Sequence, residues 1–248
     1  LSARPRGPKA PAAEAKEVSK APIVFCGTYP MLFPEVINDP QVDIVSRGES
    51  EHAILDLADK LERGEDYYDT PNLTVKKDGE VVINEMRPLI QDLEELPLPD
   101  RGLYFKYRFM KIISVKRFTS GRGCPNACSF CYNATFRGFF TGKGRYLRRK
   151  PVSRIIDEIA DMKRLAPVRS IHFSDDIFTH DKPWVMEFSR EYGKRFGDIP
   201  FTCNTTVHDI DDEMVAEMKR ANCAGIAIGV ETGNERLRID KLNKHYLD

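Results

Sequence analysis

Residues 121–135, GRGCPNACSFCYNAT, place three cysteines within eight positions, at Cys124, Cys128 and Cys131. A structural zinc site normally uses paired cysteine elements and four protein ligands, and no second pair follows here. Ferredoxin-type iron–sulfur clusters use four thiolates, so three thiolates on a cube of four irons leave one iron without a protein ligand. This stretch therefore predicts an open metal centre, to which a substrate or cofactor can bind.

The cysteine loop opens a repeating pattern of short apolar runs and amphipathic segments. The runs predict strands at residues 111–115, 171–175, 201–205 and 226–230, with helices at 153–165, 183–196 and 211–221 between them. Strands buried on both faces and joined by helices indicate a parallel sheet with right-handed crossovers. Four such units make about half of a TIM-type barrel, in which the chemistry sits at the carboxyl ends of the strands.

A loop of this spacing directly after the first barrel strand resembles the radical S-adenosylmethionine (SAM) superfamily, over residues 108–248. The resemblance implies that the three thiolates bind a [4Fe–4S] cluster, whose fourth iron chelates SAM. It implies reductive cleavage of SAM to methionine and a 5′-deoxyadenosyl radical, which abstracts hydrogen from a small-molecule substrate. An electron donor such as flavodoxin or ferredoxin is the implied partner. No catalytic side chain is assigned by the sequence.

The resemblance also suggests residues that contact SAM. Phe130, just before the third cysteine, is expected near the adenine. Asp175 and Asp176, at the end of the second strand, are expected at the methionine ammonium, where a carboxylate makes a charge-assisted hydrogen bond. The alternative is that one of these aspartates only caps the following helix.

Polar residues also end the third and fourth strands. Glu231 matches the position that binds the SAM ribose in many family members, and a carboxylate accepts hydrogen bonds from a diol. Asn204 and Thr206 are further cofactor candidates, the alternative being that they satisfy backbone groups at the strand end. His172 is expected to be a hydrogen-bonded core residue. The three other cysteines are expected to be small buried hydrophobic residues, at positions 26, 203 and 223.

Residues 21–70 resemble the last part of the Rossmann-like cobalamin-binding domain that precedes the barrel in one radical SAM subfamily. Its Gly-Gly pair is replaced by Cys26-Gly27, and its Asp-x-His-x-x-Gly motif has no counterpart here. Cobalamin is therefore implied by kinship alone. A helix ending before Gly64 is expected to bury Ile54, Leu55, Ala58 and Leu61.

The remaining segments complete an α/β organisation. Residues 1–20 are expected to be poorly ordered, and residues 71–107 to form a hairpin around Asp78-Gly79 and then a linker, with a boundary near residue 100. The fold class is thus a partial radical SAM barrel preceded by the end of a cobalamin-binding domain. The chain starts at Leu1 rather than at methionine, and both ends are expected to be cuts through a longer protein.

Bulk properties exclude several classes of function. The 248 residues carry 38 basic and 38 acidic side chains, which argues against a nucleic-acid-binding surface over the whole molecule. A basic run at residues 142–150 is expected to be a solvated loop, with a local basic patch as the alternative. No apolar run reaches the ~20 residues of a membrane span. Six cysteines, three of them clustered, favour metal binding in a reducing compartment such as the cytoplasm.

The leading hypothesis is a cobalamin-type radical SAM enzyme, a methyltransferase or a cyclase similar to the anaerobic magnesium-protoporphyrin ester cyclases. Two alternatives stay open: a zinc-stapled binding module without catalysis, and a non-catalytic half-barrel fragment. The chain alone is expected to be inactive, because six βα units are usual for these barrels and four are found.

Overall fold

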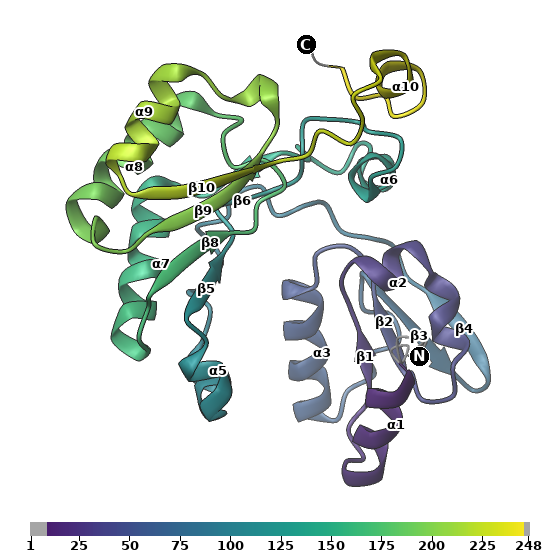
Figure 1. The fold of residues 1–248 in the computed structure, drawn as a ribbon. Helices are drawn as coiled ribbons and strands as arrows, with labels where there is room; N and C mark the ends of the chain where they lie inside the picture. Colours follow the sequence, from purple (N-terminus) through teal and green to yellow (C-terminus); the bar gives the residue numbers. More distant parts are fainter. Residues whose placement is uncertain (1–8, 246–248) are drawn as a thin grey trace, which may run out of the picture. The chain divides into compact units, whose positions relative to one another are not determined.

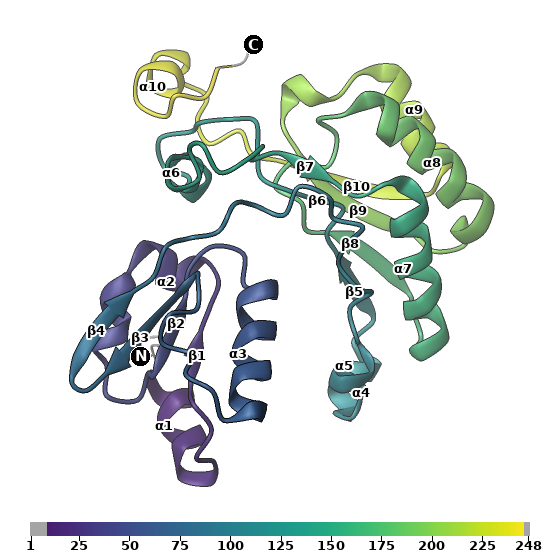
Figure 2. The same ribbon diagram turned by 180° about the vertical axis from the view of Figure 1, so that it is seen from behind.

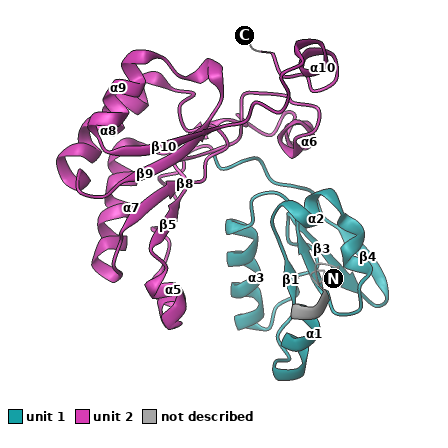
Figure 3. Ribbon diagram, in the orientation of Figure 1, with its two compact units in different colours: residues 1–90 teal, residues 91–248 magenta. Residues whose placement is uncertain are grey.

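The structure is a computed structural model that describes residues 9–245, and it divides into two compact units, residues 1–90 and 91–248 (Figure 3). This division falls earlier than the expected boundary near residue 100. The hairpin joins the sheet of unit 1, so the expected hairpin-and-linker segment 71–107 is shared between the units. The expected poorly ordered segment 1–20 lies partly outside the described residues, and residues 9–18 form a helix.

Unit 1 is built around one four-stranded sheet. Its elements are α1 (Lys9–Val18), β1 (Val24–Phe25), α2 (Thr28–Leu32), the 3₁₀ helix η1 (Pro34–Asn38), β2 (Ile44–Ser46), α3 (Glu51–Arg63), β3 (Leu73–Lys77) and β4 (Glu80–Ile83). The strand order is β1-β2-β3-β4, with β1 and β2 parallel and the other pairs antiparallel (Figure 1). The hairpin turn is confirmed, because Asp78 and Gly79 have φ angles of 50° and 86°.

Helix α3 packs on this sheet through a face other than the expected one. Ala53 and Leu57 are buried, whereas Ile54, Leu55 and Leu61 are 37%, 58% and 42% exposed. The buried pair is spaced i, i+4, and the small alanine side chain lets the helix backbone approach the sheet. The predicted apolar face was therefore wrong, although the helix ends as expected at Gly64, with φ 67°.

Unit 2 contains a second four-stranded sheet. Its elements are α4 (Gly102–Phe105), α5 (Arg108–Ile112), β5 (Val115–Phe118), β6 (Gly121–Arg122), α6 (Tyr132–Phe139), β7 (Arg148–Arg149), α7 (Val152–Leu165), β8 (Ser170–Phe173), α8 (Lys182–Phe196), β9 (Phe201–Thr205), η2 (Val207–Asp209), α9 (Asp212–Arg220), β10 (Cys223–Ile228) and α10 (Glu235–Asp240). The order is β10-β9-β8-β5 and all neighbours are parallel, as the βα pattern predicts.

Helices α7, α8 and α9 cover one face of this parallel sheet (Figures 1 and 2). The core between them is aromatic. Phe188 lies at its centre, stacked on Trp184 with ring centroids 5.2 Å apart and in edge contact with Phe173 and Phe201. Trp184, Phe188 and Tyr192 recur every four residues, so one face of α8 carries all three.

The first strand of unit 2 begins later than the sequence suggests. Helix α5 extends to Ile112, inside the expected range 111–115, and β5 starts only at Val115. Lys116 lies on the buried face of β5, where its Nζ donates to the carbonyls of Met110 (3.2 Å) and Lys111 (3.0 Å). A lysine on a buried strand face is unusual unless its ammonium has partners, so the apolar pattern missed the strand.

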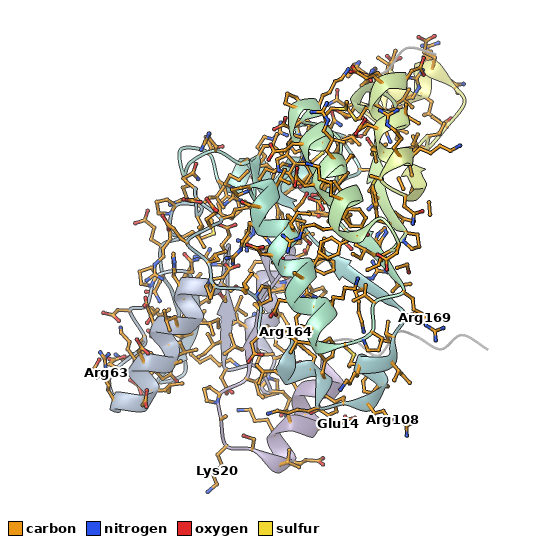
Figure 4. The ribbon with its side chains drawn as sticks, turned by 90° about the vertical axis from the view of Figure 1, so that its left-hand side faces the viewer. Glu14, Lys20, Arg63, Arg108, Arg164 and Arg169 are labelled. Carbon is orange, nitrogen blue, oxygen red and sulfur yellow. The ribbon has the colours of Figure 1, made fainter. Side chains whose placement is uncertain are left out.

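Because the four strands are parallel, their carboxyl ends share one edge of the sheet. At the opposite, amino-terminal edge lie the end of α7 and the loop into β8, marked by Arg164 and Arg169 (Figure 4). Asp181, Asp211 and Asn234 cap α8, α9 and α10 with side-chain hydrogen bonds, so each of these helices begins soon after the carboxyl-end loops. Among the described residues, no helix has the length and apolar character that crossing a membrane requires.

Candidate functional site

The three clustered cysteines lie in the loop between β6 and α6, at the carboxyl edge of the sheet. Cys124 is buried, and Cys128 and Cys131 are half-buried. The amide of Cys131 donates to the Cys128 carbonyl (3.1 Å), and α6 begins at the next residue. The loop therefore turns tightly between its second and third cysteines.

The start of the loop depends on Gly123. Its φ angle is 88°, and a Cβ atom at this position would lie 2.4 Å from the carbonyl oxygen of Tyr146. Strands β6 and β7 pair at the same place, with Gly121 opposite Arg149. A glycine is needed here because only glycine combines positive φ with such close backbone approach.

Helix α6 holds the first part of the cysteine loop. Arg137 donates to the carbonyls of Cys124 and Asn126, the latter at 3.1 Å. Asn133 places its amide nitrogen 3.7 Å from the Cys131 sulfur, while its oxygen accepts from the Tyr146 hydroxyl at 2.8 Å. These contacts hold the backbone at Cys124 and the sulfur of Cys131 from the same helix.

The environment of the thiols affects their protonation. Burial raises the pKa of the Cys124 thiol to about 11, and burial also raises the pKa of Cys128. Metal binding at these thiols therefore displaces protons. Among residues 9–245, no three His, Cys, Asp or Glu side chains converge on one ion. A cubane does not require such convergence, because each thiolate binds a different iron.

The two aspartates after β8 lie in different environments. Asp175 is 4% exposed and accepts from the Ser120 amide (3.0 Å) and the Ser120 hydroxyl (2.7 Å). Burial raises the pKa of its carboxyl, an effect opposed by the hydrogen bonds of Ser120 and the nearby Arg149 guanidinium. Asp176 is exposed and accepts from the Tyr132 hydroxyl at 3.0 Å, next to Cys131. Of these two aspartates, Asp176 is thus the one that offers its carboxylate beside the cysteine loop.

The other predicted residues differ in what they contact. Asn204 donates to the Asp175 carbonyl at 3.2 Å, which is the backbone-satisfying alternative that the sequence left open. Thr206 donates to Asp209 and lines a cavity of ≈ 190 Å³ together with Cys128. Phe130 is 54% exposed on the loop. His172 is half-buried and hydrogen-bonded to Thr202 at 2.9 Å, as expected of a structural histidine.

Glu231 follows β10 with a φ angle of 65°, which is uncommon for a residue that is not glycine. Its carboxylate lies 3.0 Å from Lys244 Nζ, which also donates to the Gly229 carbonyl at 2.5 Å. The side chain of Glu231 remains 37% exposed, so it is still accessible at the mouth of the site. Sequence reasoning missed Lys244, since no motif marks it.

The three other cysteines and the basic run at residues 142–150 lie outside the cysteine loop. Cys203 is buried and Cys223 half-buried, but Cys26 is exposed, so that part of the prediction was wrong. In the basic run, Lys150 pairs with Glu158 at 2.7 Å and Arg149 stacks over Trp184 at 4.2 Å. These two cations are therefore engaged with neighbouring elements of unit 2.

The radical SAM superfamily model matches residues 118–248, from the end of β5 through the cysteine loop and the three further strands. The chain belongs to the radical SAM superfamily. Membership implies a [4Fe–4S] cluster and SAM, for which Cys124, Cys128 and Cys131 are the predicted cluster ligands. The α/β fold with its parallel sheet is accordingly part of a radical SAM barrel, as the sequence predicts.

Curated relatives of this radical SAM chain include methyltransferases and cyclases. It is 29% identical over 219 residues to an uncharacterized methyltransferase of Pyrococcus horikoshii, covering 87% of this chain and 46% of that protein. It is 28% identical over 244 residues to the anaerobic magnesium-protoporphyrin IX monomethyl ester cyclase of Rubrivivax gelatinosus, covering 93% and 42%. The chain thus spans about half the length of the curated relatives it matches.

Solved structures with the same fold are radical SAM enzymes that are larger than this chain. The methyltransferase TsrM from Kitasatospora setae, with cobalamin and a [4Fe–4S] cluster bound, aligns with a TM-score of 0.76 at 17% identity, over 96% of this chain and 49% of TsrM. The cobalamin-dependent SAM radical enzyme OxsB aligns with a TM-score of 0.70 at 19% identity, over 93% and 34%. At these identities the likeness concerns the fold.

Proposed function

We propose that this chain supplies the cluster- and SAM-binding part of a radical SAM enzyme that performs methyl transfer or ring formation. The observation that carries the proposal is the loop of three cysteines at the carboxyl edge of a parallel sheet, with Asp176 following β8 and Glu231 following β10 at the same edge. Anaerobic reconstitution with iron and sulfide tests it, because a bound cubane makes the protein brown and contributes about four irons per chain. A colourless chain that binds zinc instead would contradict it.

The residues present suit these cofactors. Three thiolates would bind three irons of a cubane and leave the fourth iron for SAM. The chemistry that the cluster and SAM together supply is the reductive cleavage of SAM to a 5′-deoxyadenosyl radical. The protein's part is to hold the thiolates, orient SAM and accept an electron from a donor such as flavodoxin or ferredoxin. A reducing, cytoplasmic compartment suits the six free cysteines.

The contacts of the two aspartates favour different roles for them. Asp176, oriented by Tyr132, is the proposed contact of the SAM ammonium. Asp175 instead has a positioning role, since its carboxylate fixes Ser120 ahead of the cysteine loop. Thr206, which lines the cavity beside Cys128, and the exposed Phe130 remain proposed cofactor contacts, and Asn204 acts on the backbone.

Substitution of each aspartate by asparagine separates these roles. Asp176→Asn is expected to weaken SAM binding by about 1–3 kcal/mol, the range for losing a charged hydrogen-bond partner, with little change in stability. Asp175→Asn is expected to lower the free energy of unfolding by about 1.5–3 kcal/mol, because an amide nitrogen then replaces one of the two carboxylate oxygens that accept from the Ser120 amide. Calorimetry with SAM and denaturant unfolding measure the two effects. If both variants changed the SAM affinity equally, or the free energy of unfolding equally, the two aspartates would not have these different roles.

Glu231 is the proposed acceptor for the ribose hydroxyls of SAM, held by Lys244. Glu231→Gln is expected to weaken SAM binding by about 1–3 kcal/mol, since the charged acceptor is lost. Glu213→Gln is the matched control, because Glu213 is an exposed glutamate on α9 that pairs with Lys182 at 2.7 Å. If SAM affinity is the same in both variants, Glu231 has a structural role instead.

Cobalamin belongs to the proposed function of the whole enzyme. In this chain the loop after β1 would approach it, since Gly27 has a φ angle of 91° and, among the described residues, no heavy atom beyond Gly27 and its two chain neighbours lies within 4 Å of the position of a Cβ. One open loop and two parallel strands form only one side of a corrinoid site. The residues of this chain are therefore insufficient to enclose cobalamin, and no catalytic step is assigned to it.

A further inference from the structure

The chain segment Lys241–Lys244, which follows α10, contacts the cysteine loop directly. The Ser129 amide donates to the Leu242 carbonyl (3.0 Å), and the Asn243 side-chain amide donates to the Ala127 carbonyl (2.8 Å). The Ser129 hydroxyl also donates to the Lys241 carbonyl. Figures 1 and 2 both show α10 and this segment beside the loop that leads into α6. Three hydrogen bonds thus join parts of the chain that are more than a hundred residues apart.

The segment is itself anchored to the end of β10. Lys244 Nζ donates to the Gly229 carbonyl and pairs with Glu231, and the Lys244 amide donates to the Arg238 carbonyl at 3.1 Å. Arg238 is 1% exposed and Lys244 is 9% exposed. A segment tied to the sheet at this point gives the cysteine loop a fixed support.

These contacts concern one cysteine in particular. Ala127 and Ser129 are the two neighbours of Cys128, and the backbone groups of both are held by the segment. The carbonyl of Cys124 is held separately, by Arg137 of α6. The ≈ 190 Å³ cavity beside Cys128 is lined by both Asn243 and Lys244, so the segment also limits the space open to water there.

We propose that the segment Lys241–Lys244 positions Cys128 for the [4Fe–4S] cluster, with Asn243 and Ser129 as its positioning residues. The inference rests on the proposed cluster. Groups that orient a metal ligand typically contribute 10–100-fold to metal affinity, because a ligand that is free to move loses part of its binding energy. Hydrogen bonding and solvent exposure around the thiolates also tune the electronic properties of such clusters.

Asn243→Gly tests the proposal with a closely matched control. Asn243 has a φ angle of 48°, which glycine accepts, so the substitution removes the side-chain donor without backbone strain. Asn222 has a φ angle of 68° and its side chain donates to the Gly197 carbonyl at 3.0 Å, at the amino end of β10. Asn222→Gly therefore makes the same change away from the cysteine loop.

Both variants are reconstituted anaerobically, and the release of iron to a chelator is followed. We expect Asn243→Gly to release iron roughly tenfold faster than wild type and to change the electron paramagnetic resonance signal of the dithionite-reduced protein. We expect Asn222→Gly to match wild type in both. Denaturant unfolding of the apo proteins checks that the two substitutions have similar effects on the fold.

Ser129 provides a second, independent variant. Ser129→Ala removes the hydroxyl that donates to Lys241, and it is expected to accelerate iron release in the same direction. Ser129→Thr keeps the hydroxyl and is expected to restore slow release. Wild-type release in both Asn243→Gly and Ser129→Ala would overturn the positioning role while leaving the cluster intact. A wild-type chain that binds no iron would overturn the proposed function together with this inference.

Discussion

Cys128→Ala is expected to abolish cluster loading. Two thiolates hold only two of the four irons, and the lost ligand is the one whose two neighbours are both hydrogen-bonded to the segment Lys241–Lys244. Cys124 and Cys131 remain as ligands, and no other described side chain is expected to take the place of the Cys128 thiolate. Iron and sulfide counts after anaerobic reconstitution should therefore fall from about four per chain to near zero.

Cys26→Ala is the control for this substitution. Cys26 is an exposed free thiol of unit 1, so its removal changes the cysteine count without touching the loop. We expect full loading in this variant. If Cys128→Ala retains about four irons, the assignment of the three cysteines as the cluster ligands is wrong.

Phe188→Ala is expected to lower the free energy of unfolding by about 3–5 kcal/mol, the range for truncating a buried aromatic side chain. Phe188 is completely buried and contacts aromatic rings from α8, β8 and β9. The cavity left behind cannot close easily, because its walls belong to separate elements. Denaturant unfolding of unit 2 measures the loss.

Glu187→Ala, one residue earlier on the exposed side of α8, tests whether this cost is due to the core. Surface substitutions of this kind usually change stability by less than about 0.5 kcal/mol. A similar loss in both variants would show that α8 does not pack through the aromatic face described above.

The cluster loop and the helical packing of unit 2 were predictable because their signals are local. Cys124, Cys128 and Cys131 lie within eight positions, so the spacing that predicts an open metal centre, and the resemblance to the radical SAM motif, are both contained in that short stretch. Trp184 and Phe188 are spaced i, i+4, and any helix through them presents both on one face. These patterns depend on neighbouring residues, and tertiary contacts do not alter them.

Two elements were predicted wrongly because tertiary contacts override local pattern. Strand β5 buries Lys116, whose charge is stabilised by carbonyls of α5, so the apolar alternation on which a strand prediction depends is broken. Helix α3 carries two apolar stripes, and the contact of Ala53 with the sheet decides which of them is buried. Neither partner is visible in the local sequence.

The chemistry at the mouth of the site shows the same limit. The sequence pattern predicted that Asp175, Asp176 and Glu231 lie at strand ends, because the apolar runs that predict the strands stop at these residues. Which aspartate faces the loop depends on Ser120, more than fifty residues earlier, and the pairing of Glu231 with Lys244 depends on how the chain after α10 returns. Hydrogen bonds between segments far apart in sequence form only when the sheet brings the segments together. The tertiary structure therefore decided which of the polar candidates support the loop and which remain accessible to a cofactor.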